Sequence, residues 1–198
     1  MPTNENIGYY LYSLVALVIF FLGLSIIFIN LYIKKRKELL EYKSNESGLI
    51  KGAYYNQLTN LPNKLNVDMT INDQMIRCTR HHKSFFTAIV KIDNLNEVYS
   101  VQINDAIVVE TGNRLLSAVR NEDLVGYLLD GNFIIVFNEY LEDIYLETIF
   151  RRINNSFKKE LIVNDKTQKI KISVGVAKYP ENAQSAHELI NFAILNKK

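Results

Sequence analysis

The 198-residue sequence has a single cysteine, Cys78, so it cannot form an internal disulfide, which fits a reducing compartment. It also lacks a Walker loop, a dinucleotide-binding fingerprint, a nucleophile elbow and a zinc-binding spacing, which argues against the enzyme classes that those motifs mark. Its histidines, His81, His82 and His187, are not spaced as metal ligands. Charged and apolar residues make up 22% and 48%, as in an ordinary folded protein.

Charge is missing from Asn6 to Ile33, where most residues are apolar. About 20 apolar residues cross the hydrocarbon core of a bilayer, so we predict one transmembrane helix within residues 1–33. Glu5 stands where a cleaved signal peptide would carry basic residues, which favours a retained anchor. The cations of Lys34–Lys37 follow, and the positive-inside rule then predicts an external N-terminus and a cytoplasmic remainder at a bacterial inner membrane.

Residues 34–52 are predicted to form a basic juxtamembrane linker. Its helical start is expected to break near Asn45, Ser47 and Gly48, because these residue types favour turns over helix. Residues 53–198 then form a cytoplasmic domain. Apart from the membrane-proximal cations, nothing in the sequence suggests nucleic-acid binding.

Helical and strand patterns alternate along residues 53–198. Pro62 suits the first turn of a helix that is predicted to run to about Arg80. Apolar stripes predict helices at 104–119 and 141–157, and Ser185 with Glu188 forms a capping box for a last helix. Continuous or alternating apolar runs predict strands at 85–92 and 170–176, with a hairpin between the second and third helices. This order predicts an α/β (α+β) fold of the ferredoxin-like type, with a mainly antiparallel central sheet and helices on one side.

Three segments carry a family resemblance. Leu124–Phe137 reads LVGYLLDGNFIIVF, and its Asp130–Gly131 pair predicts a two-residue hairpin turn. Asn56–Lys64 reads NQLTNLPNK, and Ile172–Pro180 reads ISVGVAKYP. Together they resemble the GGDEF (diguanylate cyclase) family, which has the palm fold of nucleotidyl cyclases. The first segment of that family is close to Asp-x-Leu-Thr-Gly-Leu-Pro-Asn-Arg, and its last strand is close to Ser-Ile-Gly-Val-Ala-x-Tyr-Pro.

The resemblance implies the condensation of two GTP molecules into cyclic di-GMP by a dimer that uses Mg²⁺. The positions that match the hairpin motif are Leu129, Asp130, Gly131, Asn132 and Phe133. The family's metal-binding carboxylates fall at Lys91 and Gly131. A protonated lysine and a glycine cannot ligate a metal, so Asp93 is the one remaining carboxylate of the first motif. We therefore expect no cofactor and no catalysis.

Other positions of the implied nucleotide site are also altered. Counting along the chain places the family's guanine-reading Asn and Asp at Tyr99 and Val108. A register slip of one residue would return Asp130 to a metal position, although Lys91 would stay unsuitable. As a further hypothesis, Lys91 pairs with Asp130 and fills the empty metal position. The alternative is an active diguanylate cyclase that uses Mg²⁺.

A second implied site is better preserved. Many family members carry Arg-x-x-Asp shortly before the hairpin, where cyclic di-GMP binds as an inhibitor, and Arg120 and Asp123 match it. A further family arginine falls at Arg151 or the adjacent Arg152. Arginine can form paired hydrogen bonds to guanine, and aspartate can accept from its N–H groups. Arg120 at a helix end and Asp123 in a turn also have ordinary structural roles. The sequence therefore predicts a cyclic di-GMP receptor or a regulatory module that forms homodimers or docks on a partner signalling protein, with a pure interaction scaffold as the alternative.

Overall fold

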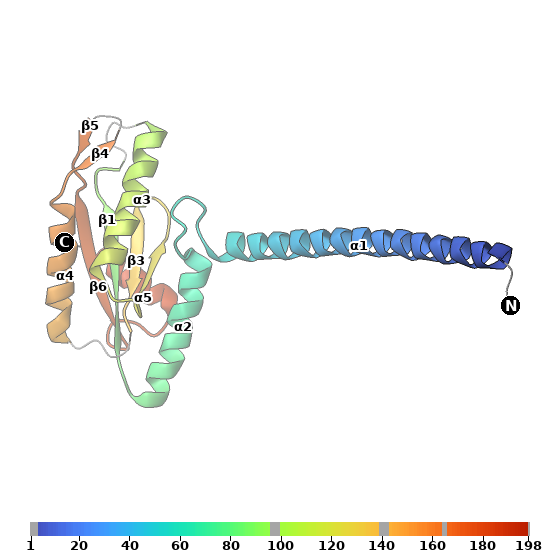
Figure 1. Cartoon of the computed structure of the whole chain (residues 1–198). Coiled ribbons are helices and arrows are strands. Elements are labelled where there is room, and N and C mark those ends of the chain that lie inside the picture. The colour runs from blue at the N-terminus through green and yellow to red at the C-terminus, as the bar shows by residue number, and fades with distance from the viewer. Residues whose placement is uncertain (1–3, 96–99, 139–142, 164–165, 198) are drawn as a thin grey trace. The chain divides into compact units, whose positions relative to one another are not determined.

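The computed structural model describes residues 4–95, 100–138, 143–163 and 166–197 (Figure 1). The chain divides into two compact units, Met1–Ile50 and Lys51–Lys198. Helix α1 runs without a break from Asn4 to Tyr54, so the interruption predicted near Asn45–Gly48 is wrong. A glycine in a helix interior lowers helix stability by about 1 kcal/mol, and polar residues lower it by less. These costs are small for a helix of 51 residues, so the helix continues through them. The predicted borders after residues 33 and 52 remain predictions.

The structure does not confirm the predicted transmembrane helix. A search confined to the described residues finds no helix that is both long and apolar enough to cross a bilayer. The membrane segment predicted within residues 1–33 therefore remains an expectation from the sequence.

The domain is built on a four-stranded sheet in the order β2-β3-β1-β6. Its strands are β1 (Phe85–Ile92), β2 (Leu124–Tyr127), β3 (Asn132–Val136) and β6 (Ile172–Tyr179). Every neighbouring pair is antiparallel, which confirms the predicted sheet. A separate two-stranded ribbon of β4 (Leu161–Val163) and β5 (Lys166–Gln168) follows the third domain helix.

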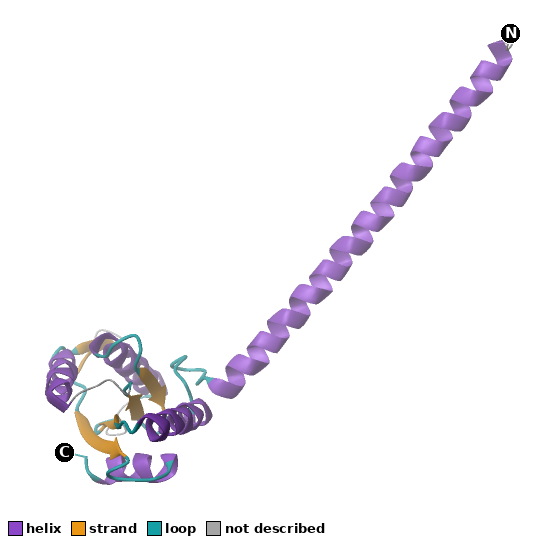
Figure 2. Ribbon diagram, turned by 90° about the horizontal axis from the view of Figure 1, so that it is seen from below, coloured by secondary structure: helices purple, strands orange, loops and turns teal. Residues whose placement is uncertain are grey.

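Four helices enclose this sheet: α2 (Lys64–His81), α3 (Val101–Ala118), α4 (Asp143–Phe157) and α5 (Ala186–Leu195). Figure 2 shows the strands between helices on both sides, so the prediction of helices on one side is wrong. Ile89 packs with the core under α2 and α5, whereas Val90 packs with the core under α3 and α4. Both faces of β1 are thus buried, because its apolar residues occupy consecutive positions rather than alternate ones.

The opening segment of the domain, NQLTNLPNK (residues 56–64), forms a hydrogen-bonded clasp between α1, α2 and β2. The Asn56 side chain accepts hydrogen bonds from the backbone N–H groups of the two residues at 58 and 59, at 3.1 and 3.0 Å. Asn63 caps α2 by accepting from the Asn66 N–H at 3.2 Å. The Pro62 carbonyl accepts from the Tyr127 N–H at 2.9 Å and so ties the clasp to β2. The segment that carries the family resemblance therefore holds the scaffold together.

The buried Arg114 joins α3 to the end of α4. Its side chain donates to the carbonyl oxygens of Ser156 and Lys159, at 3.1 and 2.6 Å, which would otherwise have no intrahelical partner. Its Nε donates to Glu110 at 2.8 Å, which balances the charge. This contact holds the C-terminal end of α4 against α3.

Candidate functional site

The hairpin tip has a left-handed backbone at three successive residues. The φ angle is 78° at Leu129, 51° at Asp130 and 73° at Gly131. The Asn132 N–H donates to the Leu129 carbonyl oxygen at 2.9 Å and closes a β-turn with Asp130 and Gly131 at its centre, as predicted. Strand pairing stops at Tyr127 and Phe133, so the loop around this turn is longer than a two-residue hairpin loop. The Asn132 side chain donates to the carbonyl oxygens of Leu129 and Asp130, at 3.2 and 3.3 Å, and braces the loop.

Gly131 fastens this tip to the end of β1. Its carbonyl oxygen accepts from the Ile92 N–H at 2.9 Å. A Cβ atom at this position would lie 3.0 Å from Leu95 Cδ2 and 3.4 Å from Ile92 Cβ, at a φ that already favours glycine. The Leu129 side chain, at the first motif position, is instead 58% exposed. Of the five motif positions, Gly131 alone is a glycine, and it packs closely against the end of β1.

The implied metal positions hold no pair of carboxylates. Lys91 lies opposite Asn132 on β3 and Ser173 on β6, in one row across three strands. The carboxylate of Asp93, just beyond β1, accepts a hydrogen bond from the Ser173 hydroxyl at 2.8 Å. Within the described ranges, no three His, Cys, Asp or Glu side chains gather as a metal site. With a cation at Lys91 and no side chain at Gly131, these residues do not fit Mg²⁺.

Among the ion pairs of the described residues, none joins Lys91 to Asp130, so the hypothesised pair is not formed in this structure. The negative charge of Asp130 acts instead on Tyr127: burial raises the pKa of this phenol, and Asp130 and Asp105 raise it further, against a hydrogen bond from the Gly131 N–H. Tyr127 packs under α3 and α4, whereas Lys91 lies in line with Ile89 on the other face. The charge of Asp130 thus acts on a residue of the opposite face from the one that Lys91 shares with Ile89.

The guanine-reading position is not Val108. That side chain is 2% exposed and lies in the core under α3 and α4. Asp105, in the opening turns of α3, carries the charge that reaches Tyr127 beside the hairpin tip. The adjacent Asn104 has a buried side-chain oxygen that accepts no hydrogen bond from any described residue. Helix α3 begins at Val101, earlier than the predicted start at 104.

Tyr99, the other position obtained by counting, lies outside the described residues.

Arg120 and Asp123 have different surroundings at the second implied site. The Asp123 carboxylate accepts from the backbone N–H groups of Arg120 at 3.0 Å and Asn138 at 3.1 Å, so both oxygens stabilise the base of the hairpin. The Arg120 guanidinium lies 5.7 Å from the centre of the Tyr145 ring and 3.8 Å from a Glu122 oxygen. The Arg120 side chain is 43% exposed and remains accessible.

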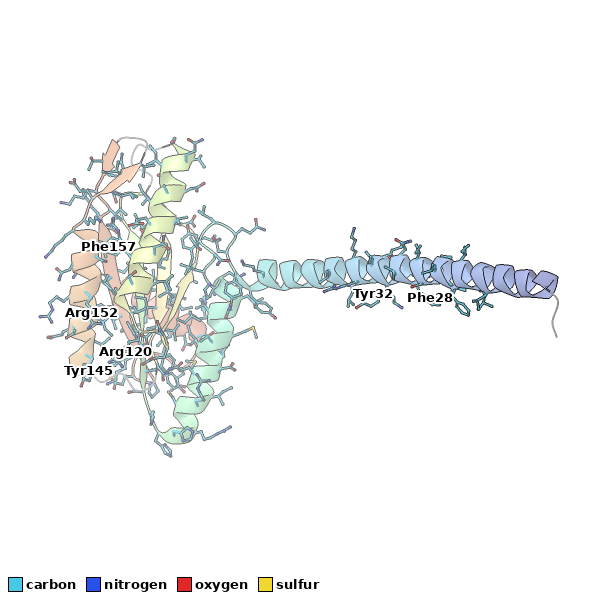
Figure 3. The ribbon with its side chains drawn as sticks, viewed as in Figure 1. Phe28, Tyr32, Arg120, Tyr145, Arg152 and Phe157 are labelled. Atoms are coloured by element: carbon cyan, nitrogen blue, oxygen red, sulfur yellow. The ribbon has the colours of Figure 1, made fainter. Side chains whose placement is uncertain are left out.

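Helix α4 offers two arginines near this site, and both are exposed. Residues seven apart on a helix share a face, so Arg152, rather than the predicted Arg151, lies on the side of α4 that carries Tyr145. Figure 3 shows Arg120 beside the Tyr145 end of α4, with Arg152 further along the same helix. The geometry thus favours Arg120, Tyr145 and Arg152 as one accessible group.

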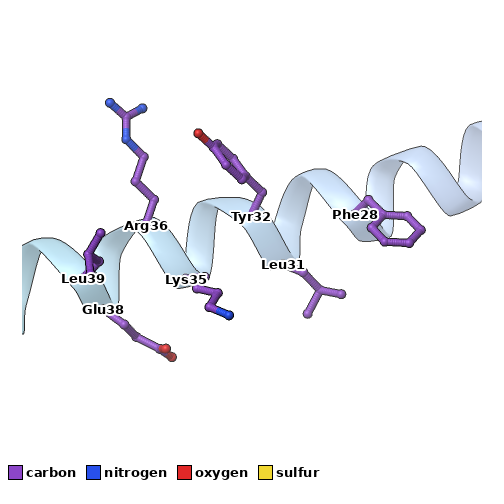
Figure 4. A pocket seen from close by; sticks show the side chains of 7 residues that line it. All are labelled: Phe28, Leu31, Tyr32, Lys35, Arg36, Glu38 and Leu39. Carbon is purple, nitrogen blue, oxygen red and sulfur yellow. The ribbon is translucent and has the colours of Figure 1, made fainter.

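Two hollows lie elsewhere. One, of about 650 Å³, lies along α1 between Phe28 and Leu39, and all of its walls are side chains of that single helix (Figure 4). An open surface of this kind does not enclose a small ligand. Its composition changes along the helix from apolar residues to Lys35 and Arg36. Another, of about 590 Å³, lies between α2 and Tyr179. Tyr179 pairs with Phe85 at the start of β1, so this hollow lies at the opposite end of the sheet from the hairpin tip.

The fold and the altered hairpin define a cyclase-like palm domain with an antiparallel sheet. Residues 53–194 match the family described as "Diguanylate cyclase, GGDEF domain". The chain therefore belongs to the GGDEF family, whose members act in cyclic di-GMP signalling.

Curated relatives are longer than this chain. It is 24% identical over 145 residues to MucR of Pseudomonas aeruginosa, a bifunctional diguanylate cyclase/cyclic di-GMP phosphodiesterase, with 72% of this chain and 21% of MucR covered. The chain spans about a fifth of the length of the curated relatives that it matches.

Solved structures share the fold at low identity. The coiled coil and GGDEF domain of DgcB from Caulobacter crescentus, in complex with cyclic di-GMP, has a TM-score of 0.71 at 15% identity, with 82% of this chain and 87% of DgcB covered. Diguanylate cyclase SiaD of Pseudomonas aeruginosa, in complex with its activator SiaC, has a TM-score of 0.68 at 18% identity, with 97% of this chain and 74% of SiaD covered.

The left-handed tip predicts an unusual response to glycine. A leucine with positive φ costs about 1–2 kcal/mol, and glycine removes that cost while losing less than about 1 kcal/mol through the unfolded state. Leu129→Gly is therefore expected to keep or raise the free energy of unfolding, by up to about 1 kcal/mol, in equilibrium urea unfolding. The matched control is Leu128→Gly, which removes a partly buried side chain without relieving a positive φ and should cost about 2 kcal/mol. Equal losses in the two variants would contradict the strained tip.

Proposed function

We propose that this protein is a regulatory member of cyclic di-GMP signalling that has lost diguanylate cyclase activity. The observation that carries the proposal is the pair Lys91 and Gly131 at the two positions where the family places its metal-binding carboxylates. Phosphoryl-type transfer depends steeply on groups that offset phosphate charge, and removing one such group typically costs 10²- to 10³-fold in rate. The framework around the tip is intact, so the loss concerns the chemistry and not the fold.

The proposed regulatory role has a receptor part and a docking part. For the receptor part, the accessible group of Arg120, Tyr145 and Arg152 supplies two cations and a ring, which suit a guanine base and its phosphates. For the docking part, the family offers precedents: the SiaD structure contains its activator SiaC, and the DgcB structure contains cyclic di-GMP. A homodimer or a partner signalling protein is the proposed assembly.

We also propose that the protein is anchored in the bacterial inner membrane, with the N-terminus outside and the domain in the cytoplasm. The support is the sequence alone: Asn6 to Ile33 has no charge, and Lys34–Lys37 follow it. No cofactor is proposed.

The loss of catalysis predicts that the purified full-length protein forms no cyclic di-GMP from GTP and Mg²⁺, as measured by chromatography of the reaction mixture. Lys91→Asp should not restore the product, because Gly131 still supplies no second carboxylate. Product above the protein-free control would establish the alternative, an active cyclase.

The receptor part predicts cyclic di-GMP binding in the micromolar range by isothermal titration calorimetry. Arg120→Ala and Arg152→Ala should each weaken it by about tenfold, the effect of losing one charge-assisted hydrogen bond. Arg80→Ala is the control, since it removes an exposed arginine at the far end of α2. Asp123 is unsuitable because its removal frees two backbone N–H groups. If no heat is detected at micromolar ligand, the receptor part fails and the docking part remains.

The anchor predicts that the protein stays in the membrane fraction after alkaline carbonate washing. A reporter fused at Asn4 should be active only outside the cytoplasm, and one fused after Lys197 only inside it. Release by carbonate, or the reverse reporter pattern, would contradict the proposed topology.

A further inference from the structure

A row of polar side chains crosses the sheet at the end next to the hairpin tip. Asn132, Lys91 and Ser173 lie opposite one another on β3, β1 and β6. Paired residues of adjacent strands project to the same face, and Ile89 and Ile134, two residues inward, pack in the core under α2 and α5. The row therefore lies on the α2/α5 face, where that core ends.

The end of α5 brings a second lysine to this row. Helix α5 approaches β6 so closely that a Cβ atom at Gly175 would collide with the Ala193 carbonyl oxygen. The same atom would lie 2.9 Å from Cγ of Lys197, so the stem of this lysine rests on the glycine beside the row. Burial and the charge of Lys91 lower the pKa of Lys197, and Asp93 partly opposes this effect. The two amines thus lie within electrostatic reach of each other.

Counting only the described residues, the two lysines outnumber the one carboxylate that acts on Lys197 at this point. Asp93 is the carboxylate that acts on Lys197, and one of its oxygens accepts from the Ser173 hydroxyl. The Asn132 amide is occupied by the turn. In the described parts of the chain, neither Lys91 nor Lys197 forms an ion pair. Two partly buried amines that repel each other and lack partners favour a bound anion.

We propose that Lys91 and Lys197 form an anion site that binds a phosphate-bearing ligand without a metal ion. An ammonium group is a compact point charge with three donors and is a common phosphate binder. At this site the lysine charges offset phosphate charge at the positions where the family uses Mg²⁺. This inference concerns a different site from the group of Arg120, Tyr145 and Arg152, and it stands or falls independently of cyclic di-GMP binding.

The test uses full-length protein in neutral detergent, with inorganic pyrophosphate as the probe in isothermal titration calorimetry. Binding should persist in excess EDTA and weaken with rising salt, as expected for a site built from lysine charges. Lys91→Gln and Lys197→Gln should each weaken it by about tenfold, and Lys91→Asp should abolish it in EDTA. Binding that appears only with Mg²⁺, or no binding at all, overturns the proposal.

Two controls make the result specific. Lys158→Gln removes an exposed lysine just beyond α4 and should leave the pyrophosphate affinity unchanged. Arg120→Ala should also leave it unchanged, which separates this site from the cyclic di-GMP site. Because Lys197 follows the last helix, its variant is expected to fold even where a β1 variant does not. An equal loss of affinity in Lys158→Gln and Lys197→Gln would show non-specific charge attraction and overturn the site.

A comparison of GTP with pyrophosphate, both in EDTA, distinguishes a nucleotide ligand from a free phosphate. If Lys197→Gln weakens the binding of both, the result supports the site. If it changes the binding of neither, the result overturns the site.

Discussion

The burial of β1 on both faces is the constraint on which the rest of the domain depends. Its apolar residues pair with β3 on one side and β6 on the other, and helices must cover both faces to exclude water. Apart from the buried Thr87, the strand is apolar until Lys91, where the core under α2 and α5 ends. The first polar side chains of the row are therefore held at fixed positions by a strand that cannot shift without exposing a core. The packing of the core therefore fixes the positions of side chains in any site at this end of the sheet.

The framework and the site respond to different physical demands. The clasp around Pro62, the contact of Arg114 with α4 and the close approach of Gly131 all satisfy buried backbone groups or tight packing, and all are present. Lys91 and Leu129 lie where side chains reach solvent, and there the charge or size of a residue can change without opening a cavity. The palm fold can thus keep its shape while the residues at the end of its sheet vary.

The sequence predicted the antiparallel sheet because strand and turn signals are local, and Phe85–Ile92 and the hairpin were found where expected. It failed where the answer depends on distant packing. A continuous apolar run such as β1 does not reveal from its periodicity alone whether one face of the strand or both are covered by helices. The length of the hairpin loop depends on where strand pairing stops. The start of α3 at Val101 was predicted three residues too late, because the boundary of a helix after a loop is the least certain part of such a prediction. The roles of Arg120 and Asp123 separated only once their partners were known.

The left-handed tip shows that strand pairing on either side, more than the residues at the bend, sets the route of the main chain. Leu129 and Asp130 adopt positive φ angles that glycine adopts freely. The main chain of the turn therefore follows this course although neither of these two positions is a glycine. Surveys that recognise this domain by its five-letter signature will therefore undercount such proteins, whereas comparison of main-chain traces will recover them. Their number in bacterial genomes is therefore better counted by comparing folds than by matching a sequence motif.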